Sequence, residues 1–116
     1  MSEWTAYFED NRRYALSRIR NMALSRQYRK ELSLWINSYL DPFYIYRAIA
    51  ERNRDFADPF NLIRTEAEKD LEFTVLSATK KDRNNSDVIL FESNLLMLFN
   101  LLLSEIRGSL SKIKPQ

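Results

Sequence analysis

The segment from Asp87 to Ile113 is the most apolar stretch of the chain, and it constrains the fold more than any other feature. Its apolar residues recur three or four positions apart, which is the period of one helical face. They are Val88, Phe91, Leu95, Leu98, Phe99, Leu102, Ile106, Leu110 and Ile113. Leu96, Met97, Leu101 and Leu103 widen this face, and the remaining polar line is Ser93, Asn100, Ser104, Arg107 and Ser111. A helix this apolar needs cover on several sides, so we predict that it forms the centre of the core.

The same segment is long enough for a second interpretation, as a membrane-spanning helix. A span needs about 20 mostly apolar residues, and Glu92, Asn94, Asn100 and Glu105 interrupt this one. We therefore favour the core helix. Asn100 is predicted to be a solvated residue on the polar line; the alternative is a buried amide that fixes the register of a partner helix.

Composition points to an all-α fold. A chain of 116 residues with one glycine and three prolines has few tight turns for joining strands. We predict a single helical domain over residues 1–116, a compact bundle of four to five helices around the apolar C-terminal helix. No basic-then-apolar signal segment opens the chain, so we expect a soluble, intracellular and cytoplasmic protein.

Helix boundaries follow from two Asp-Pro pairs, Asp41-Pro42 and Asp58-Pro59. Asp is a good N-cap and Pro suits the first helical position, so each pair predicts a helix start. We expect helices from Pro42 to about Arg54 and from Pro59 to about Lys80, then a polar loop over residues 80–87. Asn85 or Ser86 is expected to cap the last helix. Residues 3–40 form either one helix bent near Ser25 or two helices.

The inward faces of these helices are also predicted from their apolar residues. In the first two segments they are Trp4, Phe8, Ala15, Ile19 and Met22, then Tyr28, Leu32, Trp35, Ile36 and Tyr39. In the next two they are Tyr46, Ile49 and Ala50, then Leu62, Ile63, Ala67, Leu71, Val75 and Leu76.

The residues that usually carry chemistry are scarce. The chain has no cysteine and no histidine, which removes thiolate metal sites, the commonest zinc ligand and the commonest general base. Glu66, Glu68, Asp70 and Glu72 form an acidic cluster that we interpret as a solvated helix face. A Ser–Lys pair stays open, but no pattern indicates one. We predict no enzyme activity, no catalytic residue, no metal, no cofactor and no small-molecule substrate.

Charge is divided unevenly between the two halves of the chain. Met1 to Arg54 holds 10 Lys and Arg against 6 Asp and Glu, a net charge of +4, whereas Asp55 to Gln116 holds 8 against 10, a net charge of −2. Arginines alternate with aromatic residues in the basic half, a pattern typical of proteins that pair with phosphates and stack on unpaired bases. The candidate nucleic-acid-binding residues are Arg12, Arg13, Arg20, Arg26, Arg29 and Lys30. The alternative is an ordinary charged surface.

Large aromatic residues form a second candidate site. Trp35, Tyr39, Phe43 and Tyr44 are of the types enriched at the centres of protein interfaces, and we predict that they contact a partner subunit or a second copy. The alternative is that they fill the core of this chain.

The whole-chain profile is similar to that of the small subunits of CRISPR surveillance (Cascade-type) complexes, on the basis of the six basic residues named above and the aromatics between them. The resemblance implies an all-helical protein without catalytic residues that holds RNA or displaced DNA by basic surfaces within a larger assembly. The acidic cluster is not part of that pattern. The sequence thus favours a non-catalytic subunit of a nucleoprotein assembly that contacts the RNA or DNA backbone and other protein subunits, without a membrane. The alternative function is a helical adaptor or regulator that homodimerises through its C-terminal helix.

Overall fold

The computed structural model describes residues 3–52 and 58–112, and within them every regular element is a helix. The predicted all-α class is confirmed. The described helices are α1 (Glu3–Asn21), α2 (Arg26–Tyr39), α3 (Pro42–Arg52), α4 (Pro59–Leu76), α5 (Lys80–Arg83) and α6 (Ser86–Lys112). The expected helix ends at Arg54 and Ile113 lie outside the described residues.

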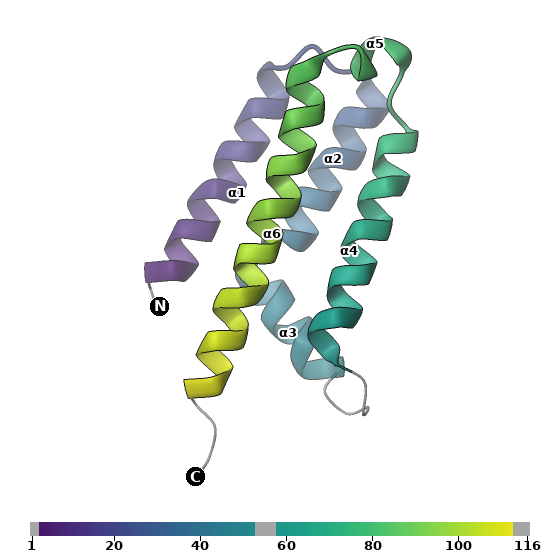
Figure 1. The fold of residues 1–116 in the computed structure, drawn as a ribbon. Coiled ribbons are helices and arrows are strands. Elements are labelled where there is room, and N and C mark those ends of the chain that lie inside the picture. Colours follow the sequence, from purple (N-terminus) through teal and green to yellow (C-terminus); the bar gives the residue numbers. More distant parts are fainter. Residues whose placement is uncertain (1–2, 53–57, 113–116) are drawn as a thin grey trace.

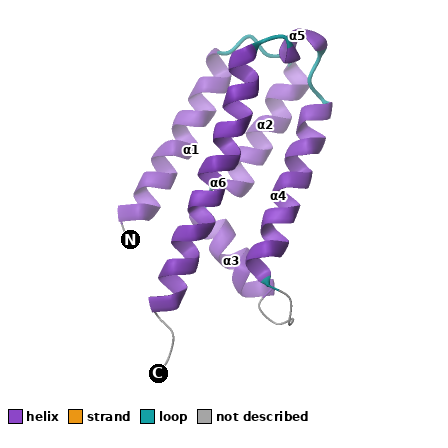
Figure 2. Cartoon of the chain, viewed as in Figure 1, coloured by secondary structure: helices purple, strands orange, loops and turns teal. Residues whose placement is uncertain are grey.

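The four long helices run alternately up and down the bundle (Figure 1). α2 packs against both α1 and α4, and α6 lies across the opposite side of the bundle in contact with α1, α3 and α4. The short helix α3 crosses one end, while α5 lies at the other end beside the connection from α1 to α2 (Figures 1 and 2). This arrangement places α6 where the apolar pattern predicted it, against the core.

The two Asp-Pro pairs begin helices as predicted. The Asp41 carboxylate accepts a hydrogen bond from the backbone N–H of Phe43 at 3.0 Å, and Asp58 accepts one from that of Phe60 at 3.0 Å. Each aspartate therefore satisfies an N–H group that the first helical turn leaves unpaired. Asn85 does the same for α6, because its side chain accepts from the N–H of Asp87 at 3.0 Å.

The predicted count of four to five helices is too low, since the described residues contain six. The error lies in residues 77–85. α4 ends at Leu76 rather than near Lys80, and Thr79 starts the separate helix α5 inside the expected loop. Thr79 and Asp82 form a capping box, in which each side chain accepts from the backbone N–H of the other.

Residues 3–40 form two helices, which settles the open alternative. α1 ends at Asn21 and α2 begins at Arg26. At this break the guanidinium of Arg29 donates to the carbonyl oxygens of Met22, at 3.0 Å, and Leu24, at 3.3 Å. The N–H of Ser25 is bound by Asp82 at 2.9 Å. The break is thus held by side chains from both directions.

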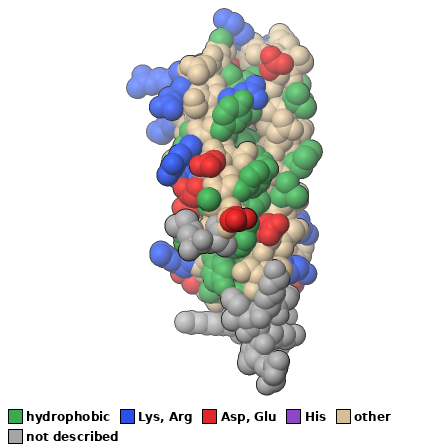
Figure 3. Space-filling model, turned by 90° about the vertical axis from the view of Figure 1, so that its left-hand side faces the viewer, with side chains coloured by type: hydrophobic (Ala, Val, Ile, Leu, Met, Phe, Trp, Pro, Cys, Tyr) green, Lys and Arg blue, Asp and Glu red, His purple; other side chains and the backbone are tan. Residues whose placement is uncertain are grey.

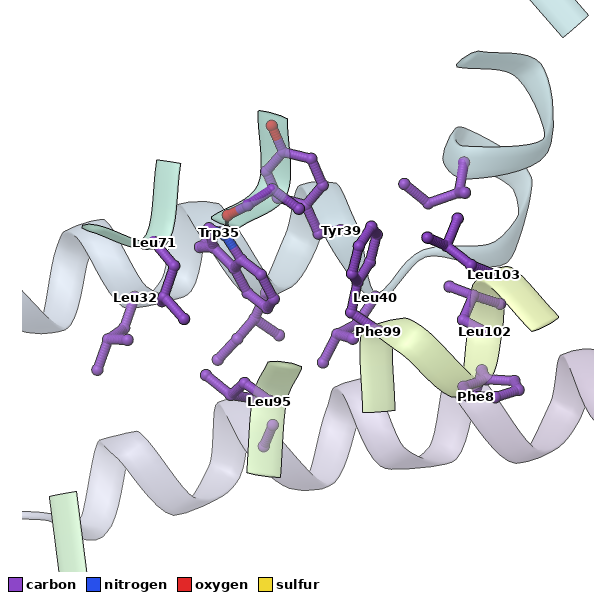
Figure 4. Packing of buried hydrophobic residues seen from close by; sticks show 14 of the residues in the cluster. Phe8, Leu32, Trp35, Tyr39, Leu40, Leu71, Leu95, Phe99, Leu102 and Leu103 are labelled. Carbon is purple, nitrogen blue, oxygen red and sulfur yellow. Dashed lines mark hydrogen bonds between the residues drawn. The ribbon is translucent and has the colours of Figure 1, made fainter. Parts of the chain in front are cut away.

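The core is formed by all of the long helices and α3, and Figure 4 shows its central part. Phe8, Leu32, Leu71, Leu95 and Phe99 are among its buried members. All five inward residues predicted for α2 are buried, as are Ile63, Ala67 and Leu71 of α4.

Some residues predicted to point inward do not. Ala50, Leu62 and Leu76 are exposed, because the buried faces of α3 and α4 are rotated toward Ile45, Ala48 and Ile63. Asn100 is exposed and accepts a hydrogen bond from the guanidinium of Arg64 at 3.2 Å, which agrees with the solvated interpretation.

Candidate nucleic-acid interface

The exposed cations of α1 and α2 form the candidate interface. Arg13 and Arg20 lie seven residues apart on α1, and Arg26 and Lys30 lie four apart on α2, so each pair shares one face of its helix. All four side chains are exposed, and α1 packs directly against α2. Figure 3, which views the molecule from the side of α1, shows Lys and Arg side chains gathered along one edge of this face. We call these four residues the basic face.

Arg12, a predicted member of this site, is engaged within the protein. Its guanidinium donates to the Glu9 carboxylate at 2.9 Å and to the Asn37 side chain at 2.8 Å, which links α1 to α2. The hydrogen bond from Glu9 outweighs burial and raises the pKa of Arg12. Arg12 therefore holds the scaffold of the basic face together.

Arg29 is engaged in the same way, through the carbonyl oxygens at the break between α1 and α2. It also lines an open groove of about 810 Å³ along α2, together with Arg26, Lys30 and Ser33. Arg29 thus contributes charge to this groove while its position is fixed by the backbone of the preceding helix.

The aromatic residues predicted to stack on bases separate into two groups. Tyr14 is exposed, whereas Tyr28 is fully buried and donates a hydrogen bond to the carboxylate of Glu92. Burial, together with this hydrogen bond, raises the pKa of Tyr28 far above its ordinary value. Of these two residues, only Tyr14 presents its ring to solvent.

The predicted partner interface is divided as well. Trp35 and Tyr39 are buried and contact Phe99 edge-on, with ring centroids 6.1 and 5.8 Å apart (Figure 4). Their polar atoms are bound inside the bundle: the Trp35 N–H donates to the carbonyl of Ala67 at 2.9 Å, and the Tyr39 hydroxyl donates to Asp70. These two residues fill the core of this chain, the alternative that the sequence left open.

Phe43 and Tyr44, at the start of α3, are the two members of that set that are exposed. They follow Asp41 directly, whose carboxylate orients the first turn of α3. The four predicted residues therefore do not form one surface.

Two buried carboxylates were not predicted as structural centres. Asp82 accepts from the N–H and hydroxyl of Ser25, at 2.9 and 2.6 Å, and from the N–H of Thr79 at 2.8 Å. The spacing of Thr79 and Asp82, a Thr followed three residues later by an acidic residue, was the available signal.

The second carboxylate, Glu92, lies 7% exposed on α6 and was noticed only as an interruption of the apolar pattern. It binds Arg83 of α5, with nitrogen–oxygen distances of 2.8 and 2.7 Å, and the hydroxyl of Tyr28. It thereby joins α2, α5 and α6 at one end of the bundle.

The acidic residues of α4 lie on its surface. Glu66 pairs with Arg52 at 3.1 Å, and Glu68 and Glu72 are exposed. Over residues 3–52 and 58–112, no three His, Cys, Asp or Glu residues are grouped in a way that would hold a metal ion.

α6 satisfies the length and composition of a membrane span over Ser86–Leu110, with a mean hydropathy of 1.5. The core helix of a soluble bundle satisfies the same criterion, and 39% of this stretch is buried against the other helices. No protein-family model, curated protein or solved structure matches the chain.

Proposed function

We propose that this chain is a non-catalytic subunit of a nucleoprotein assembly, and that it contacts the RNA or DNA backbone through the basic face. The observation that carries the proposal is the exposure of four cations on two adjacent helices. Arg13 and Arg20 lie about 10 Å apart along α1, and Arg26 and Lys30 about 6 Å apart along α2. Guanidinium and ammonium groups in such rows neutralise successive phosphates without reading base edges.

The geometry supports this function more specifically than the sequence does. Arg12 and Arg29 are tied to internal partners, so they fix the positions of α1 and α2. No ion pair within the described part of the chain involves the four residues of the basic face. Their charges are therefore available to phosphates. The similarity to the small subunits of CRISPR surveillance complexes gives the proposal its form: a helical subunit that holds a strand by its backbone.

The proposal is tested by removing two charges from the basic face. Fluorescence anisotropy with labelled single-stranded RNA and DNA is measured for wild type and for Arg26→Gln combined with Lys30→Gln. Both side chains are exposed, so helicity measured by circular dichroism should not change. Affinity should fall, and the slope of log K against log salt should become shallower by about 1 for each lost phosphate contact.

A matched control separates a local contact from general electrostatics. Lys69 is an exposed lysine on the outer side of α4, so Lys69→Gln changes the net charge by the same amount as Lys30→Gln. Lys30→Gln should weaken binding and Lys69→Gln should not. Equal effects of the two single substitutions, or an unchanged affinity of the double variant, would refute the proposed interface.

A further inference from the structure

The outer face of α6 carries no charge along most of its length. The exposed residues between Val88 and Glu105 are Ile89, Leu90, Ser93, Asn94, Met97, Asn100, Leu101 and Ser104. Leu90 is 61% and Met97 60% exposed. The outer face of a solvated helix is normally charged, so an apolar and uncharged outer face is typical of a helix that packs on both sides.

This outer face repeats with the period of a helix–helix seam. Leu90, Met97 and Ser104 are spaced seven residues apart and therefore lie in one line. One turn further on, Gly108 has open space around the position of a side chain. Small residues at these points allow a second helix to approach closely, and no charge would be buried by it.

Two grooves border α6, and their charges are opposite. On the side of α1, a groove of about 300 Å³ is lined by Tyr7, Tyr14 and Leu101, and Arg18 is its charged residue. The Arg18 guanidinium lies over the ring of Phe91, 5.4 Å from its centroid.

On the side of α4, a groove of about 610 Å³ is lined by Leu76 and Ile89, with Glu68 and Glu72 at its edge. Its third carboxylate, Glu92, is already paired with Arg83. Both grooves flank the same part of α6, between residues 89 and 98. The positive and negative edges therefore lie at the same height on opposite sides of this helix.

We propose that the outer face of α6 is a dimer interface, on which a second copy of this chain packs its own α6 in parallel about a twofold axis along the helix. This symmetry turns the α1 groove of one copy toward the α4 groove of the other, so that Arg18 faces Glu68 and Glu72 twice. In the antiparallel arrangement each groove meets its own copy, and carboxylates face carboxylates. Apolar burial drives both arrangements, and the charges select the parallel one.

Association is tested by light scattering coupled to size exclusion, with protein injected over a range up to about 100 µM, where a dimer with a micromolar Kd is mostly formed. Wild type should form a dimer. Met97→Lys combined with Leu101→Lys places two charges in the interface and should weaken dimerisation by more than about tenfold. Leu34→Lys, a substitution of an exposed leucine on α2, is the matched control and should leave the dimer intact. A monomeric wild type throughout this range would overturn the proposal.

Orientation is tested with single cysteines, because the chain contains none of its own. In a parallel pair, Leu90→Cys and Ser104→Cys each meet their own copy, so each variant alone should form a disulfide-linked dimer under mild oxidation. In an antiparallel pair centred on Met97, the two Leu90 positions are about 21 Å apart, and only a mixture of the two variants would cross-link. Gln27→Cys on α2 should not cross-link in either case. Cross-linking only in the mixture, or none at either position, would overturn the parallel arrangement.

Discussion

Asp82 is the residue whose removal should be felt most widely for one small side chain. It belongs to the four-residue helix α5, is 2% exposed, and accepts three hydrogen bonds, from the N–H and hydroxyl of Ser25 and from the N–H of Thr79. These bonds attach α5 to the break between α1 and α2. Asp82→Ala should therefore loosen the end of the bundle at which five of the helices meet or begin.

The expected magnitude follows from the groups left without a partner. Asp82→Ala deprives two backbone N–H groups of their acceptor, and each such loss costs about 1–3 kcal/mol. We expect the free energy of unfolding to fall by about 2–4 kcal/mol, a large part of the stability of a domain of this size. Urea unfolding followed by circular dichroism at pH 7 measures the change. Asp10→Ala, which removes an exposed carboxylate from α1, should change stability by less than about 0.5 kcal/mol.

The dependence on pH provides an independent check on the same carboxylate. Burial alone would raise the pKa of Asp82, but the hydrogen bonds from Ser25 and Thr79 outweigh it and lower the pKa from an ordinary value of 3.8 to about 2. Because the folded state has the lower pKa, this contribution is complete above about pH 4 and is lost as the pH falls through 2. Wild type should lose more stability than Asp82→Ala between pH 4 and pH 2. Equal acid dependence of the two proteins, with a difference below about 0.5 kcal/mol at pH 7, would refute the reasoning.

Two further substitutions test the core and its buried hydroxyl. Leu102 is fully buried, so Leu102→Asp should abolish cooperative unfolding, since an unpaired buried carboxylate costs several kcal/mol by rough estimate; thermal melting that matches wild type would contradict the core assignment. Burial raises the pKa of Tyr28 above its ordinary value of 10.0, so its contribution is complete below about pH 10 and is lost as the pH rises further. Tyr28→Phe should therefore flatten the alkaline loss of stability, and chemical unfolding at pH 9 and pH 11 would detect a variant that behaves like wild type instead.

The parts of the fold that were predictable from sequence depend on local rules. Asp41-Pro42 and Asp58-Pro59 each combine a capping carboxylate with a residue that suits the first turn, and both begin helices where expected. The buried face of α2 follows directly from helical spacing. α5 was missed even though its capping box is also local, because the polar composition of residues 80–87 was given more weight than the spacing of Thr79 and Asp82.

The candidate sites were less predictable because they depend on contacts between distant segments. Arg12 binds Asn37, 25 residues away, and its sequence neighbours give no sign of that contact. Trp35 and Tyr39 have the composition of an interface, but they share a helical face with Leu32, and that face turns inward. A sequence shows where charges and aromatic rings occur along a helix, and only the packed structure shows which of them face solvent.

The central claim, that the basic face binds nucleic-acid backbone, is tested most directly by the salt dependence of wild-type binding. Anisotropy titrations of a labelled single-stranded oligonucleotide at about 50 and 200 mM salt give the slope of log K against log salt. Four phosphate contacts predict a slope of about −3 for a single strand. Absence of binding at the lower salt concentration, or an affinity that does not change with salt, would contradict the account.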